Sequence, residues 1–263
     1  MSEAVRVGLI GLGAIGRSVV RYLREQTPGE IEIVAALVRD PAKSWPAGSP
    51  KVVGTVEELL AERPDVVVEA GGHAALREHG PAVLRAGCDL LFLSVGALAE
   101  PAAEEDLLAA ARAGGGRARV LSGAIGGLDA IAAAAVGGLT RVTHTTRKPP
   151  RTLLDPDEAA GLTEPREIFR GPARRGALLF PESINVAAAV SLAGLGLDRT
   201  EVAVIADPAV ARNQHEVVAE GAFGTLRFAI EGIPSEENQR TGRLVAMSVV
   251  HALRQRRALL SVG

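Results

Sequence analysis

Three glycines spaced as G-x-G-x-x-G stand between an apolar run and an amphipathic run near the start of the chain. Residues 5–10 predict a short strand, and the residues after the glycines carry Ile15, Val19 and Leu23 at helical spacing. A second apolar run at residues 31–38 suits a strand that is buried on both faces of a parallel sheet. This order predicts a βαβ unit in which the N–H groups at the helix start bind a pyrophosphate.

The three glycines have separate expected tasks. Gly11 permits the tight turn, Gly13 lets the backbone approach the pyrophosphate, and Gly16 allows the helix to pack closely on the strand. Ala14 and Ile15, between them, are expected to line the same site. A glycine turn that serves packing alone is the alternative, but the flanking strands and helix favour a dinucleotide, either NAD or NADP.

The choice between these two cofactors depends on the residues after the second strand. Asp40 stands where an acidic side chain would accept a hydrogen bond from the ribose 2′-OH of NAD, whereas Arg39 would pair with the 2′-phosphate of NADP. A solvated loop is the alternative for both residues. We therefore expect the protein to accept either cofactor.

The alternation of strands and helices continues to about residue 122. Thr55 followed by Glu58 predicts a capped helix start. Further strands are expected at residues 65–69, 90–94 and 119–122, and helices at 74–86 and 104–113. This succession is typical of an α/β fold with a doubly wound parallel sheet, that is, a Rossmann domain over residues 1–122.

The pattern changes after residue 122, where strands arrive in a cluster with fewer helices between them. The expected strands cover residues 139–147, 201–206, 215–220 and 225–231. They predict a smaller α+β substrate and catalytic domain over residues 123–237. Residues 155–181, rich in Pro, Gly and Arg, are expected to form loops and short helices, partly ordered over the active site.

The last segment, residues 238–263, is expected to contain a helix at about 241–258 that packs back onto the first domain. Its apolar positions are Leu244, Met247, Val250 and Leu253.

Composition excludes several function classes. The net charge of −2 lacks the excess of positive charge that is typical of proteins that bind nucleic acid or an anionic membrane. Cys88 is the only cysteine, so neither an intrachain disulfide nor a cysteine metal site is expected. The chain shows no signal peptide and no apolar run of about 18 residues, which favours a cytoplasmic protein.

The histidines contain no metal-binding cluster, and the sequence has no Gly-x-Ser-x-Gly nucleophile turn. This favours a redox reaction in which the nicotinamide does the difficult chemistry while side chains orient the substrate and transfer protons.

Two histidines are candidates for the site. His215 follows a polar, turn-rich segment between two expected strands and suits proton transfer near neutral pH. His73 stands at the carboxyl end of an expected strand, where ligands bind in open α/β sheets. The alternatives are a structural histidine at 215 and a helix-start residue at 73. His79, His144 and His251 are expected to be structural.

Two further segments carry weaker signals. Arg147 and Lys148 put two cations at the end of an expected strand, where they would bind a dicarboxylate or simply be solvated. Residues 122–129 form a second glycine-rich turn between strand and helix. Its backbone would approach the nicotinamide or a substrate carboxylate, or serve as a hinge.

Taken together, these segments resemble the L-aspartate dehydrogenase family over nearly the whole chain. The matching residues are 11–16, 69–75, 122–130, 146–150, 180–187, 207–208 and 213–216. The resemblance implies oxidation of L-aspartate to iminoaspartate for NAD biosynthesis, by a homodimer that associates through its second domain.

The same resemblance assigns individual roles. It implies that His215 is the catalytic residue and that Ala124 and Asn185 contact the nucleotide. Asn213, in the matching segment 213–216, is a candidate for a substrate contact. Ser183 departs from the family pattern, which has asparagine there, and residues 238–242 also differ slightly from it.

Two rival functions remain. One is another two-domain NAD(P) oxidoreductase, similar to homoserine dehydrogenase or dihydrodipicolinate reductase, against which residues 122–130 and 213–216 argue. The other is a dinucleotide-sensing protein without catalysis, against which His215 and Asn185 argue.

Overall fold

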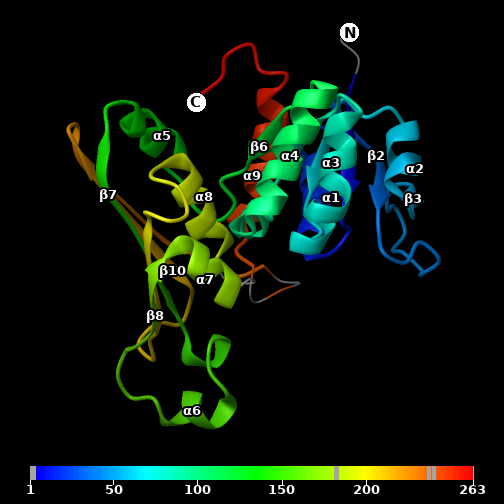
Figure 1. Ribbon diagram of the computed structural model, residues 1–263. Coiled ribbons are helices and arrows are strands. Elements are labelled where there is room, and N and C mark those ends of the chain that lie inside the picture. Colours follow the sequence, from blue (N-terminus) through cyan, green and yellow to red (C-terminus); the bar gives the residue numbers. More distant parts are fainter. Residues whose placement is uncertain (1–3, 181–183, 236–237, 239–240, 263) are drawn as a thin grey trace. The chain divides into compact units, whose positions relative to one another are not determined.

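The computed structural model describes residues 4–180, 184–235, 238 and 241–262. The chain forms two compact units (Figure 1). Unit 1 consists of Met1–Gly123 together with Val245–Gly263, and unit 2 consists of Ala124–Leu244.

Unit 1 is built on a six-stranded sheet in the order β3-β2-β1-β4-β5-β6, in which all neighbouring strands are parallel. The strands are β1 (Val5–Ile10), β2 (Ile31–Leu37), β3 (Val52–Val53), β4 (Val66–Glu69), β5 (Asp89–Phe92) and β6 (Ala118–Val120). The helices of this unit are α1 (Ala14–Gln26), α2 (Val56–Ala61), α3 (His73–Arg85), η1 (Val95–Ala99), α4 (Pro101–Gly114) and α9 (Leu244–Gln255).

Helices cover both faces of this sheet, and the buried residues of its parallel strands are therefore mainly apolar. Helices α1 and α9 pack against one core, which contains Val66 and Val68 of β4. The alternate residue Val67 faces α2, where it lies near Leu59. Figure 1 shows α3 and α4 side by side within this unit. The doubly wound parallel sheet is confirmed.

The sequence pattern at Thr55 and Glu58 predicted the start of helix α2 correctly. Thr55 accepts a hydrogen bond from the N–H of Glu58, whose side chain accepts in return from the N–H of Thr55, so the expected helix cap is a complete capping box.

The terminal helix α9 is shorter than expected, and the orientation of its buried face differs. Val250 and Leu253 are buried, but Leu244 and Met247 are 37% and 41% exposed.

The buried face of α9 instead includes small residues, Ala246 and Ala252, beside Val249. The expected apolar stripe was wrong by part of a turn, since alanines as well as large side chains form the buried face of α9. Alanine allows the helix to approach the sheet closely, so it belongs to the buried stripe.

Unit 2 is built on a five-stranded mixed sheet in the order β11-β10-β7-β9-β8. Only the β7–β9 pair is parallel. The strands are β7 (Leu139–Lys148), β8 (Arg166–Pro172), β9 (Glu201–Ala206), β10 (Gln214–Gly221) and β11 (Gly224–Glu231). The helices are α5 (Leu128–Val136), η2 (Pro150–Thr152), α6 (Pro156–Gly161), α7 (Ala173–Leu179) and α8 (Asn185–Ala193).

Helices α5, α7 and α8 lie on one face of this sheet (Figure 1). The strand burial patterns alternate accordingly, for example in β10, where odd-numbered residues up to Ala219 are buried and even-numbered ones are half-exposed. We call the helix-covered side the inner face and the other side the open face. The α+β character of this unit agrees with the sequence.

The expectation for residues 155–181 was partly wrong. Helices α6 and α7 are present, but the strand β8 lies between them and pairs with β9. Its residues include glycine, proline and two arginines, a composition that is more typical of a loop than of a strand. As an edge strand it can tolerate them, because one side of its backbone needs no ladder partner.

Candidate active site

The glycine-rich turn of unit 1 has the close backbone contacts expected of it. Gly11 has φ +93°. A Cβ on Gly11 would lie 2.5 Å from Cα of Gly71, and a Cβ on Gly16 would lie 2.3 Å from the carbonyl oxygen of Gly11. Both positions therefore require glycine, the first for conformation and contact and the second for the approach of α1.

Gly13 is different, because a Cβ placed on it would meet no protein atom within 4 Å. Gly13 is the N-cap of α1, it has no side chain to cap the helix, and the first turn contains no acidic residue. Ala14 and Ile15 begin the helix and are half-buried. The start of α1 therefore offers backbone N–H groups and space on the same side, a combination that fits the pyrophosphate of a dinucleotide.

A buried carboxylate holds the neighbouring turn. Glu69 is completely buried at the end of β4 and accepts hydrogen bonds from the N–H groups of Gly71 (2.7 Å) and Gly72 (2.8 Å). It also accepts from the N–H (3.1 Å) and the hydroxyl (2.8 Å) of Ser94. Burial raises the pKa of Glu69, and these hydrogen bonds oppose the rise.

The other nucleotide candidates in unit 1 stand at the ends of strands. Arg39 and Asp40 follow β2 and are both exposed, and Asp40 also accepts a hydrogen bond from the N–H of Ala42. His73 is the first residue of α3 and is half-buried. The structure thus brings these residues and the glycine turn to the carboxyl edge of one parallel sheet.

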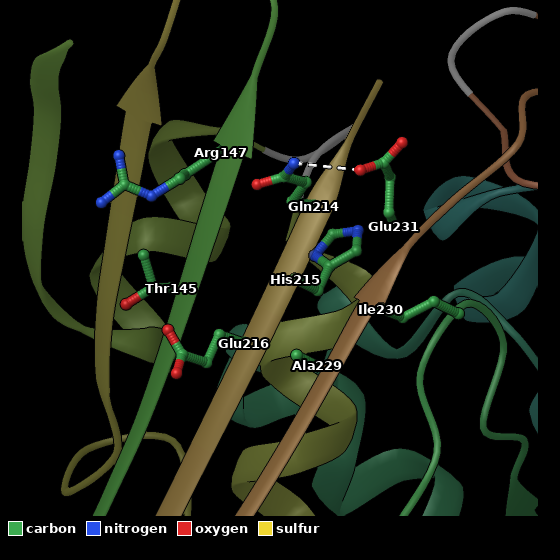
Figure 2. Close-up of a pocket in the computed structure, with 8 residues that line it drawn as sticks. All are labelled: Thr145, Arg147, Gln214, His215, Glu216, Ala229, Ile230 and Glu231. Carbon is green, nitrogen blue, oxygen red and sulfur yellow. Dashed lines mark hydrogen bonds between the residues drawn. The ribbon is translucent and has the colours of Figure 1, made fainter. Parts of the chain in front are cut away.

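In unit 2, His215 lies on β10 with its imidazole on the inner face. The residue is 8% exposed and pairs with Thr146 of β7 on one side and Ile230 of β11 on the other. Figure 2 shows the side chains of His215 and Glu216 on opposite sides of the strand. The candidate proton carrier therefore lies on an inner strand of the sheet, paired on both sides.

A second histidine meets it. His144 of β7 is completely buried, and its Nε2 lies 3.2 Å from Nδ1 of His215. Burial and the charge of Lys148 lower the pKa of His215 to about 4. Burial, His215 and Lys148 also lower the pKa of His144 well below its usual value. Both rings are therefore neutral at neutral pH.

Arg147 and Lys148 occupy opposite faces, because neighbouring residues of a strand alternate. Lys148 is 8% exposed and shares the inner face with His144. Arg147 points to the open face and forms an ion pair with Asp207 at 3.1 Å. Of the two cations, Lys148 is therefore the one whose charge acts on His215.

The remaining candidates of unit 2 occupy turns and helix starts. Asn213 immediately precedes β10, Asn185 is the first residue of α8, and Ala124 is half-buried in the turn before α5. In that turn, a Cβ on Gly126 would lie 2.7 Å from the ring of Phe228. Ser183 and Gln239, two of the positions that depart from the family pattern, lie outside the described residues.

A pocket of about 340 Å³ lies along β7, β10 and β11 (Figure 2). Its lining residues are Thr145, Arg147, Gln214, His215, Glu216, Ala229, Ile230 and Glu231. Six of these eight belong to the open face by strand alternation, and Gln214 donates a hydrogen bond to Glu231 there. This pocket therefore belongs mainly to the face opposite the His215 imidazole.

Sequence reasoning missed the contributions of His144 and Glu69. Glu69 ends an apolar strand, and a charged residue at the end of a buried strand was a usable signal. His144 gave no comparable signal, because its contact with His215 depends on the register of two strands that lie far apart in the chain.

Among the described residues, no group of three or more His, Cys, Asp or Glu side chains could hold a metal ion. No helix in the same part of the chain is long and apolar enough to cross a membrane.

The fold and these residues define a two-domain nicotinamide-dependent oxidoreductase. Residues 11–121 match the family described as "Homoserine dehydrogenase, NAD binding domain", and residues 129–256 match "Aspartate dehydrogenase, C-terminal". The chain belongs to the L-aspartate dehydrogenase family.

Curated relatives support this placement. The L-aspartate dehydrogenase of Ruegeria pomeroyi is 45% identical over 98% of this chain and 94% of its own length. That of Cupriavidus necator is 43% identical over 98% and 100%. The crystal structure of aspartate dehydrogenase from Thermotoga maritima superposes with a TM-score of 0.80, at 27% identity, over 98% of this chain and 99% of that one.

Proposed function

We propose that this protein oxidises L-aspartate to iminoaspartate with NAD or NADP, and that His215 carries the proton. The observation that carries the proposal is the position of His215, a neutral imidazole fixed in a sheet beside the buried cation Lys148. The family names of the relatives supply the substrate, and the glycine turn of unit 1 supplies the nucleotide site.

The reaction needs a proton acceptor at the substrate nitrogen. The ammonium group of aspartate loses a proton, Cα then loses a hydride, and the nitrogen lone pair forms the C=N bond. Bound nicotinamide supplies the hydride acceptor at C4. His215 suits the first step because it is neutral, and it also suits the later activation of water that hydrolyses iminoaspartate to oxaloacetate and ammonia.

Electrostatics favour an anionic substrate. Lys148 is buried, and its positive charge lowers the pKa of both histidines. A substrate carboxylate placed near Lys148 would offset this charge and raise the pKa of His215 toward the range that is useful for proton transfer. Lys148 is the preferred carboxylate ligand because it shares the inner face with His215 and its charge acts on that ring, whereas Arg147 lies on the open face.

The nucleotide residues follow from unit 1 and from the family resemblance. Gly11, Gly13, Ala14, Ile15 and Gly16 would hold the pyrophosphate at the start of α1. Ala124 and Asn185 would contact the nicotinamide half. Asn213 and His73 are the remaining candidates for substrate contacts.

A substrate panel tests the function. The purified protein is incubated with NAD or NADP and, separately, with L-aspartate, D-aspartate, L-homoserine and L-glutamate, and cofactor reduction is followed by absorbance. We expect reduction with L-aspartate above all. Reduction with L-homoserine alone would favour the rival enzyme, and nucleotide binding without turnover would favour a sensor.

We also propose that the enzyme is a cytoplasmic homodimer whose product serves NAD biosynthesis. The open face of unit 2 supports the dimer, since it presents an ordered sheet surface with paired charges such as Arg227 and Glu216 at 3.3 Å. Replacing Val218 on this face by arginine should halve the mass measured by sedimentation. Val136→Arg, at a site that is 90% exposed on α5, is the matched control and should leave the mass unchanged.

A further inference from the structure

His144 makes one specific polar contact within the described part of the chain. Its Nε2 lies 3.2 Å from Nδ1 of His215, and its own Nδ1 is buried without a hydrogen-bond partner there. The two rings are nearly parallel, with an interplanar angle of 17° and centroids 5.4 Å apart. A completely buried imidazole with one unsatisfied nitrogen is costly, so its presence here calls for an explanation.

The contact follows from the strand register. His144 is paired with Val217, and His215 with Thr146, so the two histidines are diagonal neighbours on the inner face. The backbone of two central strands therefore fixes the distance between the rings.

The geometry determines which nitrogen of His215 is available. Its Nδ1 is turned to His144, so Nε2 is the nitrogen left for a substrate. Nε2 can accept a proton only if the ring hydrogen of neutral His215 is on Nδ1, and this hydrogen then needs an acceptor. Nε2 of His144 is placed to be that acceptor, and neutral His144 then carries its own hydrogen on Nδ1, the buried nitrogen without a hydrogen-bond partner in the described part of the chain.

We propose that His144 is a positioning residue that accepts the Nδ1–H hydrogen bond of His215 and so presents the lone pair of Nε2 to the substrate. The proposal rests on the proposed function of His215 as the proton carrier. His144 itself touches neither substrate nor nucleotide in this account.

The surroundings keep His144 neutral, as an acceptor must be. Two titratable groups act on it, Lys148 of its own strand and His215 of β10. The neighbouring β9 presents Val202 and Val204 on this face, and α8, which packs on β7, contains no titratable residue. Protonation of His144 would place a cation beside Lys148 in a site without solvent, and it is therefore disfavoured.

Nitrogen-15 NMR of the histidine-labelled wild-type protein tests the tautomer directly, without any substitution. We expect His215, assigned by comparison with His215→Gln, to carry its hydrogen on Nδ1. A spectrum with the hydrogen on Nε2 would overturn the proposal.

Three variants test the consequence. His144→Phe removes the acceptor, His144→Gln keeps a polar amide near the position of Nε2, and Val202→Ala is the control, since it loosens the packing opposite His144 without touching the hydrogen bond. We expect His144→Phe to lower kcat by about tenfold to a hundredfold with an unchanged Kd for NAD. His144→Gln should recover most of this loss, and Val202→Ala should keep kcat within about threefold of wild type.

Equal loss of kcat in His144→Phe and Val202→Ala, matched by equal loss of thermal stability, would reduce His144 to a packing residue and contradict the proposal. Failure of the proposed function has a different signature, because His215→Gln would then keep its turnover whatever the His144 variants do.

Discussion

The carboxylate of Glu69 accepts two hydrogen bonds from Ser94, one from its backbone N–H and one from its hydroxyl, at a site with no solvent exposure. It thereby ties the end of β5 to the turn after β4. The same carboxylate holds the N–H groups of Gly71 and Gly72, and Gly71 packs directly against Gly11 of the nucleotide turn. Glu69 thus fixes the position of Gly71, the residue against which the glycine turn packs.

Glu69→Gln should therefore weaken nucleotide binding as well as folding. The amide must direct its NH₂ group at one or more N–H donors, so at least one buried hydrogen bond is lost, at about 1.5–3 kcal/mol. We expect a lower melting temperature and a Kd for NAD that rises about tenfold, measured by calorimetry. Glu58→Gln is the control, since Glu58 also accepts backbone hydrogen bonds but lies in the exposed capping box of α2.

Alanine substitutions separate the tasks of two glycines. Gly13→Ala should fold normally, because its Cβ meets no protein atom within 4 Å, but the methyl group should occupy the space of the pyrophosphate and weaken NAD binding. Gly16→Ala should lower the melting temperature, because its Cβ would lie 2.3 Å from the Gly11 carbonyl oxygen. Equal effects of both changes on stability would contradict this division.

Cofactor preference should be mild, because Arg39 and Asp40 are both exposed after β2. Kinetics with NAD and NADP should give comparable efficiencies, and a preference above about a thousandfold, equal to about 4 kcal/mol, would contradict the expectation. Asp40→Ala should shift the ratio toward NADP, and Arg39→Ala toward NAD.

Stability should fall as the pH is lowered from about 6.5 to about 4. The pKa of His215 is lowered to about 4 by burial and Lys148, so the unfolded chain takes up a proton in this range before the folded chain does. The expected loss from this residue is about 2 kcal/mol at pH 5. Urea unfolding at several pH values gives the free energy of unfolding as a function of pH. This free energy should change less with pH in His215→Gln than in wild type, and an identical pH dependence would refute the assignment of the effect to His215.

Local features of the sequence sufficed for most of unit 1, although the two-residue strand β3 and the short helix η1 were not expected. The glycine turn, the Thr55 cap and the apolar parallel strands each depend on neighbouring residues, and all are present in the structure. Strand β9, Glu201–Ala206, was also placed correctly, because a continuous apolar run marks it.

Relationships that depend on register could not be predicted. His144 meets His215 only because Arg147 pairs with Gln214, a fact that no local pattern contains. The separation of Arg147 from Lys148 was accessible, however, since adjacent residues of a predicted strand must point to opposite faces. Strand β8 was missed because its edge position permits a composition typical of loops.

The most direct test of the central claim compares wild type with His215→Gln, measuring L-aspartate oxidation and NAD binding in the same preparations. The account predicts that kcat falls about a hundredfold to ten-thousandfold while the Kd for NAD stays within about twofold. Turnover near the wild-type rate in a folded His215→Gln protein would contradict it.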